Sequence, residues 1–166
     1  MDNEPPELAP GCVAPDFEAS AIGGPYESPV LVQLKAFLGS TVVLYFYPKD
    51  DTPGCTTQAC GLRDRWEQIQ RPDTYFFGIS GDSLTSHEKF IQKFALPFPL
   101  ISDESHEVAQ VYGVWVEKSM YGKKFFGTER TTFVIRPDGR IKSVFRKVNA
   151  ADHADLIDTN LSNLET

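Results

Sequence analysis

The chain has 166 residues, of which 41% are hydrophobic and 23% charged, so it can form one globular domain with a packed core. Its net charge of −7 argues against nucleic-acid binding, because neutralising phosphates takes clustered Lys and Arg. No apolar run approaches the ~18 residues of a membrane span, and the acidic, proline-rich start lacks the features of a signal peptide. We therefore expect a cytoplasmic protein that binds neither membrane nor nucleic acid, with a flexible tail (1–9) and one domain (10–166).

Taken in chain order, the hydrophobic patterns of the first half alternate between strand and helix. Residues 15–40 are rich in Gly, Pro and Ser, which indicates short strands and loops. The continuous apolar run "TVVLYFY" over 41–47 predicts a strand buried on both faces, and Pro48 ends it. Apolar residues then recur at helical spacing, so residues 55–70 predict a helix.

The second half repeats this order and closes with a hairpin and a helix. The predicted segments are a strand at 74–80, a helix opened by a Thr85–Glu88 capping box, a strand at 98–102, a short helix ended by Gly113, a hairpin over 130–135 and 140–145, and a helix from about Ala150 capped by Asn149. Strands that alternate with helices form βαβ units with a largely parallel sheet, which the closing hairpin makes mixed. The order predicts a thioredoxin-like α/β domain with helices on both faces of the sheet and an N-terminal β extension.

The chain has three cysteines, and two of them, Cys55 and Cys60, lie close together where the first buried strand passes into a helix. An odd, small number of cysteines does not suggest a disulfide scaffold. The three histidines are scattered and match no zinc-ligand spacing, so we expect no metal and no cofactor. A close cysteine pair in a reducing compartment is then best explained by redox chemistry.

Cys55 lies in the turn after a parallel strand, which is where such folds place their active sites. Free N–H groups and the positive end of the helix dipole favour a thiolate at this position. Thr52 brings a hydroxyl that can donate to the thiolate or accept from a substrate, and Pro53 stiffens the loop. A Thr-Pro-Gly turn beside an unreactive buried cysteine is the alternative that this segment alone leaves open.

Cys60 follows Cys55 by five residues, a spacing that a continuous helix makes unsuitable for a disulfide. Such positions have Cα atoms roughly 8–9 Å apart, whereas a disulfide needs them within about 7 Å. If the two sulfurs bond, the helix must unwind locally. A bond that is made and broken during a reaction cycle fits this spacing better than a permanent bridge.

The segment "FYPKDDTPGCTTQACGLRD" closely resembles the active-site segment of peroxiredoxins, in particular the Q-type or bacterioferritin-comigratory-protein subgroup. Pro48, Thr52 and Cys55 match the family pattern P-x3-T-x2-C, and Cys60 matches the additional cysteine of the subgroup. The resemblance extends from about residue 11 to residue 164 and includes "GCVAPDF", "GIS", "YGVWVEKSMYGKKFFGTERTTFVI" and "DGRI".

The resemblance implies an antioxidant thiol peroxidase that acts on hydrogen peroxide and organic hydroperoxides. By this likeness Cys55 is the peroxidatic cysteine and becomes a sulfenic acid, and Cys60 resolves it as an intramolecular disulfide that thioredoxin or a related dithiol reduces. Arg130 would stabilise the thiolate and the peroxide, while Thr52 would orient the peroxide oxygens.

Three further residues of the same loop are expected to border the substrate: Pro48, Pro53 and Gly54. Because an intramolecular resolving cysteine requires no partner subunit, we expect a monomer. Two other functions stay open at this point, a general thiol–disulfide oxidoreductase and a redox sensor. Cys12 is either a small near-surface residue or an extra thiol for intermolecular disulfides.

Overall fold

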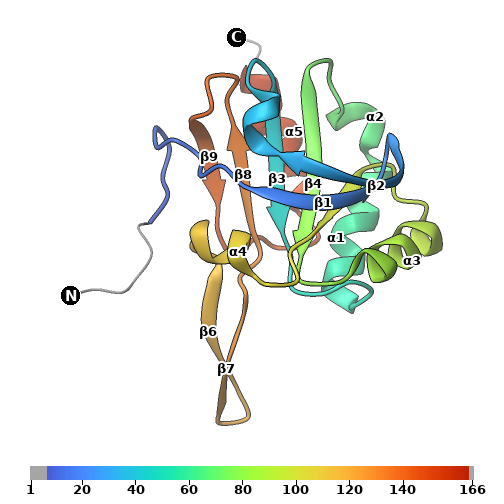
Figure 1. The fold of residues 1–166 in the computed structure, drawn as a ribbon, viewed down its shortest axis with the longest axis vertical. Helices are drawn as coiled ribbons and strands as arrows, with labels where there is room; N and C mark the ends of the chain where they lie inside the picture. The colour runs from blue at the N-terminus through green and yellow to red at the C-terminus, as the bar shows by residue number, and fades with distance from the viewer. Residues whose placement is uncertain (1–6, 165–166) are drawn as a thin grey trace.

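The structure is a computed structural model that describes residues 7–164. A seven-stranded mixed sheet with strand order β2-β1-β5-β4-β3-β8-β9 forms its centre, and a separate two-stranded sheet is made by β6 and β7 (Figure 1). The strands are β1 (Glu18–Gly23), β2 (Tyr26–Gln33), β3 (Thr41–Phe46), β4 (Thr74–Ser80), β5 (Pro99–Ser102), β6 (Trp115–Met120), β7 (Lys123–Thr128), β8 (Thr131–Ile135) and β9 (Ile141–Phe145). The helices are η1 (Leu34–Phe37), α1 (Pro53–Asp64), α2 (Trp66–Ile69), α3 (Leu84–Phe94), α4 (Glu107–Val111) and α5 (His153–Leu164).

Strand β3 lies near the middle of the sheet and is buried along its whole length. It runs parallel to β4 and antiparallel to β8. In the antiparallel pair, Phe46 at the end of β3 lies opposite Thr131 at the start of β8. The residues just before β8 are therefore brought beside the loop that follows β3.

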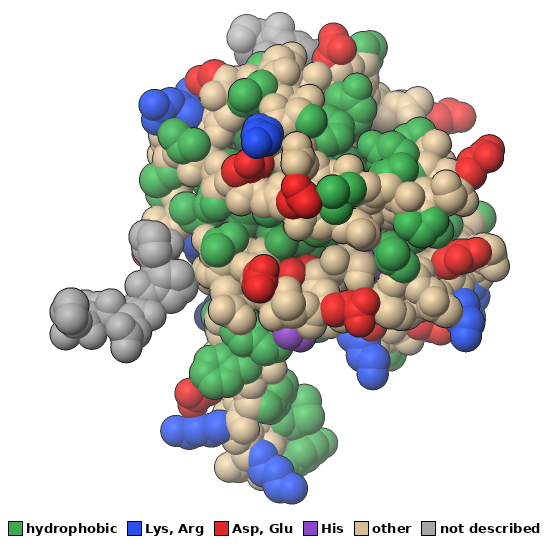
Figure 2. Space-filling view, viewed as in Figure 1, with side chains coloured by type: hydrophobic (Ala, Val, Ile, Leu, Met, Phe, Trp, Pro, Cys, Tyr) green, Lys and Arg blue, Asp and Glu red, His purple; other side chains and the backbone are tan. Residues whose placement is uncertain are grey.

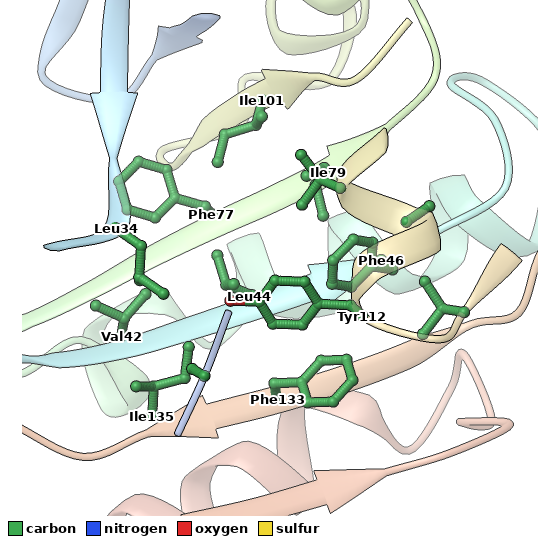
Figure 3. Packing of buried hydrophobic residues seen from close by; sticks show 14 of the residues in the cluster. Leu34, Val42, Leu44, Phe46, Phe77, Ile79, Ile101, Tyr112, Phe133 and Ile135 are labelled. Carbon is green, nitrogen blue, oxygen red and sulfur yellow. The ribbon is translucent and has the colours of Figure 1, made fainter. Parts of the chain in front are cut away.

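Two hydrophobic clusters cover the two faces of the sheet, because alternate residues of a strand point to opposite sides. Val42, Leu44 and Phe46 of β3 belong to one cluster, which α4 and the chain before β1 cover (Figure 3). Val43 and Tyr45 belong to the other cluster, which α1, α2, α3 and α5 cover. A strand buried on both faces needs apolar residues at every position, which explains the continuous run in the sequence.

The β6–β7 hairpin projects from the body of the molecule, below the sheet in the view of Figure 1. Apolar and lysine side chains both lie on its surface (Figure 2), and Phe126 is 59% exposed. The sequence analysis did not predict this hairpin. Its pattern is not that of a buried strand, since most of its residues are exposed or half-buried.

The predicted alternation of strands and helices is confirmed, with three local corrections. The helix expected over 55–70 is two helices, because Arg65 has non-helical torsions between them. The Thr85–Glu88 capping box is wrong: Ser83 is the N-cap of α3, and its side chain accepts from Ser86 N. The last helix begins at His153, and Asn149 caps only a preceding turn by accepting from Ala151 N.

The tail expected over residues 1–9 lies mostly outside the described residues. At its end Leu8 is buried in the first cluster, and its carbonyl oxygen accepts a hydrogen bond from Arg146. Among residues 7–164, no helix combines the length and apolar character needed to cross a membrane.

Candidate active site

Cys55 lies in the first turn of α1, and its side chain is buried, with 2% of the residue exposed. The backbone bond from Thr56 N to Thr52 O begins the helical ladder. The amides of Gly54 and Cys55 therefore precede that ladder and point out of the helix end, as the first N–H groups of any helix do. Pro53 suits this place because it has no N–H to leave unpaired.

Arg130 brings a guanidinium group to this helix end. Its Nη2 donates to Cys55 Sγ at 3.4 Å, and its Nη1 donates to Gln58 Oε1 at 2.5 Å. The pairing of β3 with β8 explains this contact, since Arg130 directly precedes β8 at the end of the sheet where α1 begins. Gly54 leaves the space for the guanidinium, because a Cβ there would lie 3.0 Å from Nη2.

Gln58 continues the hydrogen bonds away from the sulfur into the protein interior. It lies three positions after Cys55, so both side chains lie on the same face of α1. Its Nε2 lies 2.9 Å from His153 Nδ1, and His153 Nε2 lies 2.7 Å from Thr132 Oγ1. Burial, and secondarily the positive charge of Arg130, lower the pKa of His153 to about 3, so its ring is neutral at physiological pH.

Asp50 holds the loop between β3 and α1 in place through hydrogen bonds of its side chain. This carboxylate accepts hydrogen bonds from Tyr47 Oη at 2.6 Å and Ser86 Oγ at 2.8 Å, and it lies 2.7 Å from His87 Nδ1. His87 Nε2 donates to the carbonyl oxygen of Ile101 at 2.9 Å, because a carbonyl oxygen only accepts. The ring and carboxylate thus tie the loop that leads into α1 and Cys55 to α3 and β5.

The structure brings some of the predicted residues into contact with Cys55 and leaves others exposed on the surface nearby. Cys55 and Arg130 are in contact, as the sequence analysis expected. Thr52 Oγ1 donates to the carbonyl oxygen of Lys49 at 2.9 Å, which leaves its oxygen lone pairs to accept from another group. Pro48, Pro53 and Gly54 are exposed along the same loop.

Cys60 lies in the same continuous helix as Cys55 and is half-buried. Both thiols are free, and so is Cys12, which is exposed. With α1 intact, the two cysteines of the pair have the five-residue separation that a disulfide does not tolerate.

Gln58, Thr132 and His153 are parts of the site that the sequence analysis missed. The position of Gln58, three residues after the reactive cysteine on the same face of a helix, was a usable signal. His153 and Thr132 gave no such signal, because they reach the site only through the packing of α5 and β8 against α1. A surface cavity of about 460 Å³ lined by residues such as Tyr26 and Trp66 includes none of these groups, so the chemistry of Cys55 and not cavity size identifies the site.

Comparison with known proteins agrees with this geometry. The AhpC/TSA family model matches residues 10–144. Peroxiredoxin Bcp of Bacillus subtilis is 43% identical over 143 residues, which cover 86% of this chain and 88% of that protein. Peroxiredoxin Bcp of Escherichia coli K12 is 41% identical over 150 residues, covering 90% and 93%.

Among solved structures, peroxiredoxin Q of Xanthomonas campestris superposes with a TM-score of 0.82 at 34% identity, covering 96% of this chain and 98% of that one. The expected thioredoxin-like fold is thereby confirmed. A buried thiol at a helix N-terminus, in contact with a guanidinium and set in this fold, therefore has a clear assignment: the chain belongs to the AhpC/TSA family and is a peroxiredoxin of the Bcp or Q type.

Proposed function

We propose that Cys55 is the peroxidatic cysteine of this thiol-dependent peroxidase and that Cys60 resolves it. The observation that carries the proposal is the 3.4 Å contact between Arg130 Nη2 and Cys55 Sγ at the N-terminus of α1. A positive charge and free amide groups stabilise the thiolate, which is the form that attacks. The same donors stabilise the negative charge that develops on the peroxide oxygens.

In the first step the thiolate sulfur attacks the terminal oxygen of the hydroperoxide. A sulfur–oxygen bond forms, the O–O bond breaks, and the leaving oxygen takes a proton to depart as water or an alcohol. Cys55 is oxidised to a sulfenic acid and the peroxide is reduced. The Thr52 oxygen accepts from the peroxide hydroxyl, the Gly54 and Cys55 amides donate to the peroxide oxygens, and Pro48 shields the sulfur from water.

In the second step α1 unwinds and the Cys60 thiolate attacks Cys55 sulfur. A disulfide forms, and the sulfenic oxygen leaves as water after protonation. A dithiol reductant of the thioredoxin class then reduces the bond. Because both sulfurs belong to one helix, a monomer completes this cycle, and a reducing compartment such as the cytoplasm keeps the resting thiols free.

The Xanthomonas campestris bacterioferritin comigratory protein, 33% identical to this chain with a TM-score of 0.82, is described for alkyl peroxide reduction. We extend that substrate class to this chain, together with hydrogen peroxide. The extension depends on the shared fold and on the exposure of Pro48, Pro53 and Gly54 beside Cys55.

Stopped-flow mixing of the prereduced protein with hydrogen peroxide or cumene hydroperoxide tests the proposal. We expect oxidation of Cys55 to be several orders of magnitude faster than oxidation of free cysteine, followed by a slower phase that yields a Cys55–Cys60 disulfide on peptide mapping. The Cys55→Ser variant is the control and should show neither phase. A wild-type rate no faster than that of a free thiol would refute the peroxidase assignment and favour a redox sensor.

A further inference from the structure

A buried line of hydrogen bonds leads from the reactive sulfur across three elements of the fold. It passes from Cys55 to Arg130, Gln58, His153 and Thr132, with the heavy-atom distances given above. Gln58 is 1% exposed, and His153 and Thr132 are fully buried. These three side chains are shielded from solvent, so each partner in the line determines the orientation of the next.

The donor and the acceptor in each hydrogen bond of this line follow from the first donor, Arg130. A guanidinium only donates, so Gln58 must turn its oxygen toward Arg130 and its NH₂ toward His153. His153 Nδ1 must then be the unprotonated nitrogen that accepts. The proton of the neutral ring is on Nε2, from which it is donated to Thr132 Oγ1.

Protonation of His153 would break this order, because Nδ1–H would face the NH₂ of Gln58. Of the groups around the ring, Arg130 is cationic, Tyr45 packs against it with centroids 5.3 Å apart, and Gln58 and Thr132 are uncharged. No carboxylate among the described residues bonds to it. The surroundings therefore keep the ring neutral and in a single tautomer, although it never touches the sulfur.

We propose that His153 is a positioning residue for the peroxide reaction: it fixes the amide of Gln58, and Gln58 fixes the guanidinium of Arg130 against Cys55. This inference rests on the function proposed above. Arg130 alone still requires the oxygen of Gln58 to face it, but without an acceptor at Nδ1 the amide is held from one side only and is free to turn. The hydrogen bond with Gln58, which aims the guanidinium at the sulfur, is thereby weakened.

The same line of bonds also opposes the second step of the cycle. Gln58 lies between Cys55 and Cys60, so unwinding this part of α1 separates it from His153 and Arg130. Weakening the His153–Gln58 bond should therefore slow the attack on peroxide and speed the closure of the disulfide. A variant that only loosens the packing of α5 should not slow the attack on peroxide, because it leaves the hydrogen bonds of Gln58 and Arg130 in place.

The test compares variants that differ in the acceptor they offer to Gln58. His153→Leu removes both ring nitrogens. His153→Asn places an oxygen close to the position of Nδ1, whereas His153→Gln places its amide close to the position of Nε2. Ile157→Ala is the matched control, because Ile157 is also fully buried in α5 but belongs to the apolar cluster.

We expect His153→Leu to lower the second-order rate constant for peroxide by about tenfold, the upper end of the effect of one lost hydrogen bond between uncharged groups. His153→Asn should recover most of this loss and His153→Gln little of it. Disulfide closure after oxidation should be faster in His153→Leu than in the wild type. Ile157→Ala should leave the peroxide rate within about twofold.

A second measurement needs no peroxide and separates this inference from the proposed function. In a Cys12→Ser, Cys60→Ser background Cys55 is the only thiol, and its ionisation is followed by the ultraviolet absorbance of the thiolate. The pH profile of this absorbance should move to higher pH with His153→Leu and return with His153→Asn, even if the wild type fails to consume peroxide. The inference is overturned if the profile does not move, if His153→Asn and His153→Gln behave alike, or if Ile157→Ala reproduces the rate loss.

Discussion

Mild acid should destabilise the folded protein through His153. The pKa of this group is about 3 in the folded chain, because burial and the nearby Arg130 disfavour its charged form, against about 6.5 for an unfolded histidine. The unfolded chain thus binds the proton more readily as the pH falls. The stability that depends on a neutral His153 is complete above pH 6.5 and is lost progressively toward pH 3.

The size of the effect follows from these two values. Between pH 7.5 and 5.5 the free energy of unfolding should fall by about 1.4 kcal/mol through this one group. Any folded-state pKa well below 5 gives the same result, so the expected value does not depend on the depth of the shift. The interval also stays above the range in which most carboxylates titrate.

Urea unfolding at several pH values, followed by tryptophan fluorescence under reducing conditions, measures this slope. His153→Asn supplies the reference, because it keeps an acceptor for Gln58 but does not titrate in this interval. His87, His106 and all carboxylates are common to both proteins, so the difference between the two slopes isolates His153. Parallel pH dependences for wild type and variant would refute the reasoning.

Three further predictions concern the reaction itself. Cys60→Ser should complete one turnover with peroxide but stall with thioredoxin and over-oxidise more readily, as mass spectrometry of Cys55 would report; normal cycling would exclude Cys60 as the resolving residue. Arg130→Gln removes the charge beside the sulfur and should slow oxidation by about 10- to 100-fold in stopped flow, whereas an unchanged rate would deny the guanidinium its role. Gly54→Ala should slow oxidation several-fold without lowering stability, since its Cβ would lie 3.0 Å from Arg130 Nη2. Gly61→Ala in the same helix is the control, because its Cβ would meet no atom within 4 Å. Equal oxidation rates for the two alanine variants would contradict this prediction.

The sequence by itself determined the order of elements and the position of Cys55 at the start of a helix. The run over 41–47 has the continuous apolar character of a strand buried on both faces, and the structure places β3 there. The Pro and Gly before Cys55 mark the start of a helix, and α1 begins at Pro53. These features depend on neighbours in the chain, so local patterns were sufficient to predict them.

Element ends were predicted less well where two local signals competed. Thr85 with Glu88 satisfies the capping-box pattern, but Ser83 lies closer to the turn after β4 and takes the N-cap position. Asn149 has the chemistry of an N-cap, yet α5 begins only at His153. In both cases the chemistry of a single side chain was not enough to determine the residue at which the helix begins.

What surrounds the sulfur was decided by tertiary structure. Arg130 reaches Cys55 because β8 pairs antiparallel with β3, and His153 reaches Gln58 because α5 packs beside α1. Both contacts join residues more than seventy positions apart, at distances that no periodicity in the sequence encodes. The chain therefore specifies the position of the Cys55 thiol locally, whereas the charge and the hydrogen bonds around it exist only after the sheet and its helices have assembled.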